Sequence, residues 1–124
     1  KEGKGIIFLT AHYGNWELSS QAASIKGYPM KVLARRQKKS FVDEILNKHR
    51  NQNGCEVVTK GANLRVALRT LKDKKNLGML ADEDVKEGGV FVDFFHRHVS
   101  APKGPALIAS RTDTPLIFSF FKRI

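Results

Sequence analysis

The sequence contains one cysteine, no long hydrophobic run and few acidic residues, and each shortage excludes a class of protein. Cys55 is the only cysteine among the 124 residues, so no intramolecular disulfide can form and a reducing compartment is the simpler interpretation. The apolar runs fall far short of the roughly 20 residues that a membrane-spanning helix needs. No secretory signal pattern opens the chain. We therefore expect these residues to form a soluble or peripheral piece of protein.

Acidic side chains are scarce relative to basic ones. Twenty-two Lys and Arg residues stand against 12 Asp and Glu residues, which gives a formal net charge of +10. This excess favours anionic partners such as nucleic acid, anionic lipid headgroups, phosphates or an acidic protein. The aromatic residues lie in apolar runs instead of alternating with basic ones, and no helix-turn-helix or zinc pattern is present. A nucleic-acid-binding module is therefore the weaker of the interpretations that the charge allows.

The length and the two ends of the chain bear on its domain organisation. A chain of 124 residues suits one domain and is long enough to bury a core. It starts at Lys1 without a methionine and stops just after the apolar run 115–121, where a sheet would be half built. We expect residues 1–124 to be a single domain that lacks its N-terminal and C-terminal parts.

Short apolar runs alternate with segments of helical periodicity along most of the chain. The clearest helix is 62–75, because its apolar residues Leu64, Ala67, Leu68 and Leu71 share one face. The alternation favours right-handed crossovers, and so an α/β fold with a mostly parallel sheet and helices on both faces. Residues 82–103 are expected to form an acidic loop, an aromatic run and a basic loop. The expected strands are 6–9, 30–34, 55–58, 77–81 and 115–121, and the expected helices are 16–26, 40–53, 62–75 and 104–111.

A histidine and a carboxylate follow the first expected strand. Ligands of parallel sheets bind at the carboxyl ends of the strands, and the segment HYGNWE at residues 12–17 lies at such an end. If His12 lies in a turn and Glu17 in the first helical turn, the carboxylate can hydrogen-bond one imidazole nitrogen. The other nitrogen is then left to take a proton from a hydroxyl. Gly14 favours the tight reversal that this pairing needs.

The HYGNWE segment is similar to the motif of a histidine, four residues and an acid in the lipid A biosynthesis (late) acyltransferases, which belong to the lysophospholipid acyltransferase-like superfamily. The resemblance extends over nearly the whole chain, in order and with matching spacing. The further blocks are LARRQKKSFVDEI (33–45), RNQNG (50–54), LGMLADEDVKEGGVFVDFF (77–95) and KGPALIASRTDTPLIF (103–118). The chain therefore resembles the central catalytic part of such an enzyme.

The resemblance implies an O-acyltransferase that moves a fatty acyl chain from an acyl carrier protein thioester, or from acyl-CoA, to a hydroxyl of a glycolipid such as a lipid A precursor. It implies His12 as the general base and Glu17 as the acid that holds it, with no cofactor and no metal. The expected location is the cytoplasmic face of the inner membrane, with the protein bound peripherally or anchored by the missing N-terminal segment. A thioesterase or hydrolase that uses the same pair remains open, because both reactions begin with a base activating an oxygen nucleophile against a thioester.

Four further residues are candidates for substrate binding. Arg35 and Arg50 match the arginines of two family blocks, and their guanidinium groups suit the phosphates of a glycolipid or a phosphopantetheine. A solvated basic surface is the alternative for both. Asp82 and Asp84 could orient these arginines or bind part of the acceptor, although an acidic turn after a strand is also common surface structure.

The sequence departs from the family pattern around the expected acceptor pocket. Where the family usually has Gln between two aspartates, this chain has Glu83, and His96 replaces a usual glycine after paired phenylalanines. Ala101 replaces a common threonine. These differences bear on which glycolipid is used and leave the expected pair intact. The basic tripeptide at residues 96–98 lacks the further ligands that a zinc site needs.

Overall fold

The computed structural model describes residues 4–34, 40–51, 54–59 and 63–122. Every strand and helix expected from the alternating pattern is present, with ends that differ by a few residues. In chain order the elements are β1 (Ile7–Thr10), α1 (Trp16–Ile25), β2 (Met30–Ala34), α2 (Ser40–Asn51), β3 (Glu56–Thr59), α3 (Asn63–Lys72), β4 (Asn76–Leu80), β5 (Val90–Phe94), β6 (Arg97–Ala101), α4 (Gly104–Thr112) and β7 (Leu116–Phe118).

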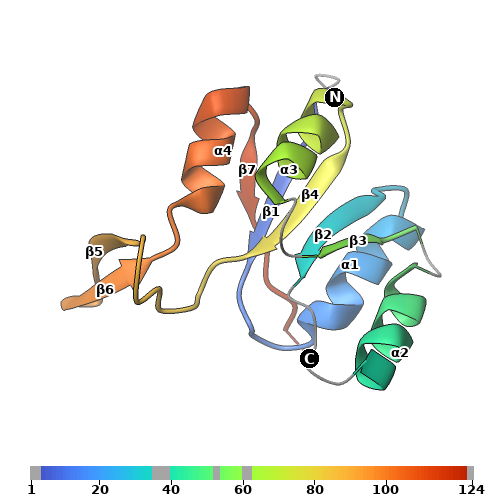
Figure 1. The fold of residues 1–124 in the computed structure, drawn as a ribbon, viewed down its shortest axis with the longest axis horizontal. Coiled ribbons are helices and arrows are strands. Elements are labelled where there is room, and N and C mark those ends of the chain that lie inside the picture. The colour runs from blue at the N-terminus through green and yellow to red at the C-terminus, as the bar shows by residue number, and fades with distance from the viewer. Residues whose placement is uncertain (1–3, 35–39, 52–53, 60–62, 123–124) are drawn as a thin grey trace.

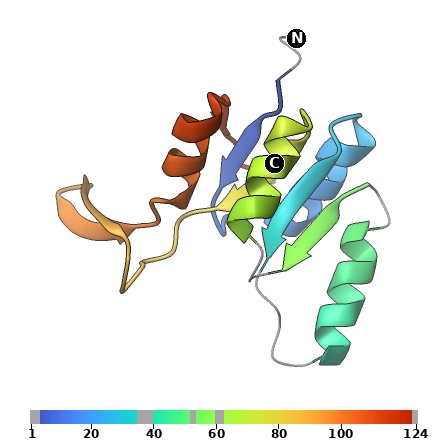
Figure 2. The same cartoon turned by 45° about the horizontal axis from the view of Figure 1, so that its top comes forward.

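One sheet organises the molecule. Its strands run in the order β3-β2-β4-β1-β7, and all neighbours are parallel. Helices α1 and α2 pack together on one face and α3 and α4 on the other, as Figures 1 and 2 show. Right-handed crossovers produce this arrangement, because the chain moves outward from β1 to β3 through α1 and α2 and then returns through α3. The expected α/β class with a mostly parallel sheet is confirmed.

The core lies between the central strands and helices α3 and α4. Ile7 of β1 and Leu77 of β4 are fully buried and lie opposite each other in the sheet. Ala67 and Leu71 of α3 pack against them. Burying one leucine or isoleucine side chain stabilises a fold by about 1.5–3 kcal/mol. The apolar face expected for α3 is confirmed at Ala67, Leu68 and Leu71, whereas Leu64 in its first turn is exposed.

The segments that follow the neighbouring strands β1 and β4 lead to opposite faces of the sheet. The chain after β1 enters α1 on one face, and the chain after β4 leads to α4 on the other. Thr10 pairs with Leu80 where the two strands end, and the Ala81 N–H donates to the Thr10 carbonyl oxygen at 3.3 Å. Open α/β sheets bind ligands in the crevice at such a switch point. Residues just beyond Thr10 and Leu80 are therefore placed to form a site.

Strands β5 and β6 form a separate antiparallel hairpin that projects away from the large sheet (Figure 1). Val92 pairs with Val99 in its middle, and Phe94 pairs with Arg97 beside the turn. The prediction of a basic loop after the aromatic run is wrong, because residues 97–101 form β6. Cross-strand pairing of β-branched and aromatic residues stabilises this strand, and the run of basic residues conceals that pattern in the sequence.

The HYGNWE turn packs closely against the segment that follows β7. Gly14 has a positive φ of 64° and forms a β-bridge with Phe121. A Cβ atom on Gly14 would overlap the Phe121 carbonyl oxygen, so both the backbone conformation and the close approach require glycine. Asn15 then caps α1, with its Oδ1 accepting a hydrogen bond from the Leu18 N–H at 3.2 Å. The reversal expected at Gly14 is confirmed.

Replacing Gly14 with alanine in the full-length protein is expected to destabilise the fold. A left-handed backbone costs an L-residue about 1–2 kcal/mol, and the added methyl group would also displace the Phe121 backbone. Gly27→Ala is the matched control, because Gly27 also has a positive φ (87°) but nothing within 4 Å of an added Cβ. Urea unfolding should show the larger loss of unfolding free energy for Gly14→Ala. Equal losses would show that the contact with Phe121 contributes nothing.

Candidate active site

His12 and Asp82 emerge side by side from the carboxyl edge of the sheet. His12 lies two residues beyond the end of β1, and Asp82 lies two residues beyond the end of β4. The two strands are parallel neighbours whose last residues, Thr10 and Leu80, are paired. Strand register therefore brings together two residues that are 70 positions apart in the chain.

Two hydrogen bonds join His12 to Asp82. The Asp82 Oδ1 lies 2.8 Å from the His12 Nδ1, and the Asp82 Oδ2 accepts a hydrogen bond from the His12 backbone N–H, also at 2.8 Å. A single carboxylate thus fixes both the ring and the backbone of the histidine. The His12 side chain is 42% exposed, so a substrate can reach the ring.

The charge of Asp82 determines which imidazole nitrogen is free. Burial by itself would raise the pKa of Asp82, but the hydrogen bonds from the backbone and ring of His12 outweigh it and hold the pKa below its ordinary value. The carboxylate is therefore ionised at neutral pH and can only accept hydrogen bonds. In the neutral imidazole this acceptor places the proton on the His12 Nδ1, which leaves a lone pair on the Nε2 to accept a proton from a substrate.

Trp16 restrains the histidine ring from a second side. The two rings pack edge to face, with centroids 5.1 Å apart and an interplanar angle of 74°. Trp16 is the first residue of α1, so the cap at Asn15 that starts this helix also positions the indole. The ring of His12 is therefore held between a carboxylate beyond β4 and an aromatic side chain of α1.

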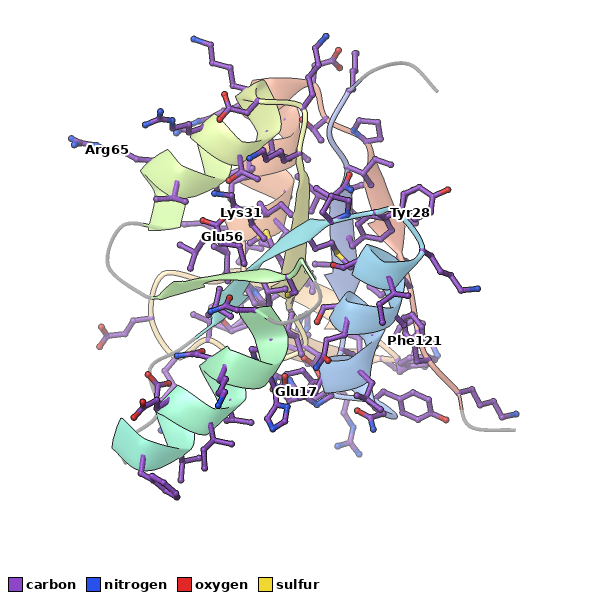
Figure 3. The ribbon with its side chains drawn as sticks, turned by 90° about the vertical axis from the view of Figure 1, so that its right-hand side faces the viewer. Glu17, Tyr28, Lys31, Glu56, Arg65 and Phe121 are labelled. Carbon is purple, nitrogen blue, oxygen red and sulfur yellow. The ribbon has the colours of Figure 1, made fainter. Side chains whose placement is uncertain are left out.

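Glu17 and Arg50 form a second charged pair, between α1 and α2. Figure 3 shows Glu17 near the N-terminal end of α1, on the side of α2. The Arg50 Nε donates to the Glu17 Oε2 at 2.9 Å, and the Arg50 Nη2 donates to the Oε1. Arg50 is only 5% exposed, so this bidentate contact compensates a charge that is almost fully removed from water. The hydrogen bond to Glu17 raises the pKa of Arg50 against the opposing effect of burial.

The pairing expected from the HYGNWE spacing differs from the one in the structure. We expected Glu17 to hydrogen-bond His12, but the partner of His12 is Asp82 and the partner of Glu17 is Arg50. Because α1 begins at Trp16, Glu17 is directed toward α2, whereas β4 places its following carboxylate directly beside His12. Asp82 thus occupies the place that the spacing assigned to Glu17. The signal that could have identified it is that both His12 and Asp82 follow the ends of expected strands.

The other candidate residues contribute less to this arrangement. Arg35 lies outside the described residues, and Asp84 is exposed on the loop beyond Asp82. Cys55 is fully buried, and burial raises the pKa of its thiol against the opposing hydrogen bond with Ser20, which suits packing better than nucleophilic chemistry.

In the part of the chain that the structure describes, no group of three or more His, Cys, Asp or Glu residues could hold a metal ion. No helix within the described ranges has the length and apolar character needed to cross a bilayer.

A mostly apolar cavity of about 80 Å³ lies between α1 and the sheet. Side chains of β2 such as Met30 and Val32 form part of its wall, and Glu17 and Arg50 supply charged groups at its surface. Trp16 both lines the cavity and contacts the ring of His12. The cavity is therefore adjacent to the histidine, and an apolar lining with few polar groups is typical of a small-molecule pocket.

Known proteins resemble this chain over almost its whole length. The family model described as bacterial lipid A biosynthesis acyltransferase matches residues 1–123. The chain is 28% identical over 118 residues to a phosphatidylinositol mannoside acyltransferase of Mycolicibacterium smegmatis, and the match covers 92% of this chain and 39% of that protein. It is 26% identical over 119 residues to a protein of the same name from Mycobacterium tuberculosis, covering 93% of this chain and 38% of that protein. The chain thus spans about two fifths of the length of these curated relatives.

These matches confirm the resemblance that HYGNWE and the following blocks indicated. The family and both relatives are named as acyltransferases, which is the enzyme class that the resemblance implied. The pair formed by His12 and Asp82 and the pair formed by Glu17 and Arg50 all lie within the matched residues. The chain belongs to the bacterial lipid A biosynthesis acyltransferase family.

Proposed function

We propose that this chain forms the catalytic centre of an O-acyltransferase in which His12 is the general base and Asp82 orients it. The observation that carries the proposal is the pair of hydrogen bonds between these two residues at the carboxyl edge of β1 and β4. They leave the Nε2 of His12 as a proton acceptor in a partly open position. A positioned histidine of this kind is suited to activating a hydroxyl.

In the proposed reaction the Nε2 of His12 removes the proton from an acceptor hydroxyl while the hydroxyl oxygen attacks the carbonyl carbon of a thioester. The tetrahedral intermediate then collapses and its carbon–sulfur bond breaks. The imidazolium returns the proton to the departing thiolate, so the products are an ester and a thiol. Asp82 stabilises the imidazolium between these two transfers, because its carboxylate lies 2.8 Å from Nδ1.

The acyl donor is proposed to be an acyl carrier protein thioester or acyl-CoA, and the acceptor a glycolipid such as a lipid A precursor. The apolar lining of the cavity beside Trp16 supports a donor with a hydrocarbon chain. The family name concerns lipid A and the names of the relatives concern phosphatidylinositol mannoside, and both compounds are glycolipids. Arg35 stays a predicted contact of the phosphates of the glycolipid or of the phosphopantetheine, and Asp84 stays a predicted contact of the arginines or the acceptor.

The proposed place of action is the cytoplasmic face of the inner membrane. A glycolipid acceptor is held in a bilayer, so the enzyme has to meet it at the membrane surface. The net charge of +10 favours anionic headgroups, by about 1 kcal/mol for each Lys or Arg near the surface.

Replacing His12 with alanine in the full-length protein should lower kcat by about 10²- to 10⁴-fold, because the general base is lost. Asp82→Asn should lower kcat by a similar factor, because an amide neither stabilises the imidazolium nor enforces the proton on Nδ1. Acyl transfer from an acyl carrier protein thioester to a lipid A precursor, followed by thin-layer chromatography, measures both effects.

Glu87→Gln is the matched control, because Glu87 is an exposed carboxylate on the same loop as Asp82. This variant should keep wild-type kcat. Near wild-type transfer by folded His12→Ala would refute the mechanism. Release of free fatty acid without acylated lipid would instead identify the enzyme as a thioesterase.

Glu17→Gln should lower both stability and kcat, because it leaves the Arg50 guanidinium buried without its counter-charge. Glu17 is partly exposed, so we expect a loss of unfolding free energy on the order of 2 kcal/mol, below the 3–5 kcal/mol typical of fully buried pairs. A double-mutant cycle with Arg50→Met, read out by urea unfolding and by kcat, separates two roles.

If Glu17 acts through Arg50, then Arg50→Met should impair kcat as strongly as Glu17→Gln, and the double variant should be no worse than either single one. If instead Arg50→Met keeps wild-type kcat while Glu17→Gln does not, Glu17 acts on the reacting groups themselves. That outcome would support the catalytic role first predicted from the HYGNWE spacing.

A further inference from the structure

The turn of the β5–β6 hairpin has an unfavourable backbone conformation for its residues. Phe95 and His96 join the two strands, and both have positive φ, at 50° and 62°. A two-residue hairpin turn with both φ values positive strongly prefers Asn-Gly, Asp-Gly or Gly-Gly, because other side chains are strained in this region. The presence of a phenylalanine with positive φ therefore calls for an explanation outside the hairpin itself.

The same hairpin exposes large aromatic side chains to solvent. Phe95 is 83% exposed, Phe91 77% and Phe94 60%. Phe94 and Phe95 pack edge to face at the tip, with ring centroids 4.7 Å apart. An exposed cluster of apolar side chains marks a surface that contacts another apolar phase or partner. Backbone strain and aromatic exposure thus coincide at one point.

One arginine and two histidines follow these aromatic residues in the sequence, and Arg97 pairs with Phe94 across the hairpin. Arg97 follows the turn directly, between His96 and His98. Asp93 is the one carboxylate of these two strands, and its Oδ1 lies 3.0 Å from the His98 Nδ1. Aromatic side chains flanked by basic groups match a bilayer interface that carries anionic lipid, where rings enter the acyl boundary and cations contact the headgroups.

The position of the hairpin relative to His12 also fits binding to a bilayer. The loop that begins at Asp82 leads directly from the end of β4 into β5, so the hairpin leaves the sheet at the edge where His12 lies. Figures 1 and 2 show it extending outward from the large sheet. A surface bound by this hairpin would therefore lie near the site at which a membrane lipid has to react.

We propose that the β5–β6 hairpin tip inserts Phe94 and Phe95 into the interface of a bilayer containing anionic lipid. Phe91 adds apolar area on the strand leading to the tip, and Arg97 contacts the headgroups. The inference rests on the proposed function, because a glycolipid acceptor brings the enzyme to a membrane. Insertion of the tip also explains the phenylalanine in the strained turn, since asparagine or glycine at residue 95 would relieve the backbone and remove the apolar ring.

The decisive variant is Phe95→Asn in the full-length protein, because asparagine tolerates the positive φ while removing the ring. Its binding to vesicles of phosphatidylcholine and phosphatidylglycerol, measured by co-sedimentation, should weaken roughly tenfold. Its thermal stability should be equal to or higher than that of the wild type. Phe41→Asn is the matched control, because Phe41 is 71% exposed on α2, which lies on the other side of the molecule (Figure 1). This control should bind vesicles like the wild type.

Three results would overturn the proposal. The first is unchanged vesicle binding by Phe95→Asn. The second is a lowered melting temperature of Phe95→Asn without vesicles, which would show that another part of the protein covers the ring. The third is equal weakening of vesicle binding by Phe41→Asn.

The binding assay is repeated in the His12→Ala background to separate this inference from the proposed function. Retained vesicle binding by His12→Ala, with a further roughly tenfold loss on adding Phe95→Asn, supports the hairpin contact independently of catalysis. If the wild type transfers acyl groups but Phe95→Asn binds vesicles normally, the hairpin proposal fails alone. If vesicle binding depends on Phe95 but no transfer is detected, the proposed function fails alone.

Discussion

The parallel pairing of β1 with β4 is the constraint on which the rest of the structure depends. Ile7 and Leu77 are buried opposite each other in these strands. A shift of one residue in either strand would turn its buried side chains to the other face of the sheet. The same register sets His12 against Asp82 beyond the strand ends. The packing of the core and the geometry of the site are therefore fixed together.

The turn between β1 and α1 separates two residues that belong to different charged pairs. His12 precedes the turn and is bound by Asp82 from the neighbouring strand, whereas Glu17 follows it and is bound by Arg50 from α2. The close approach of Gly14 to Phe121 and the cap at Asn15 hold this turn. One pair is open to solvent and can exchange protons, while the other is largely buried and fixes α1 against α2.

The loop from β4 connects the reactive pair to the exposed hairpin. Asp82 starts this loop, and the aromatic strand β5 ends it. The hairpin contributes little to the core, since the side chains of β5 are exposed along their whole length. An exposed aromatic strand with a strained turn is what the proposed contact with a membrane surface requires.

The sequence by itself determined the α/β class, the order of the elements and the segment that contains the histidine, because these depend on local periodicity and turn residues such as Gly14. It also placed Asp82 at a strand end, but assigned it to the arginines or the acceptor and not to His12. Only the tertiary structure decided that Asp82 contacts His12 and that Glu17 contacts Arg50. The physical reason is that sheet order and register arise from long-range pairing of β1 with β4 and from helix packing, and neither leaves a signal in the spacing of nearby residues. The strand β6 was missed likewise, because it is stabilised by its cross-strand partners.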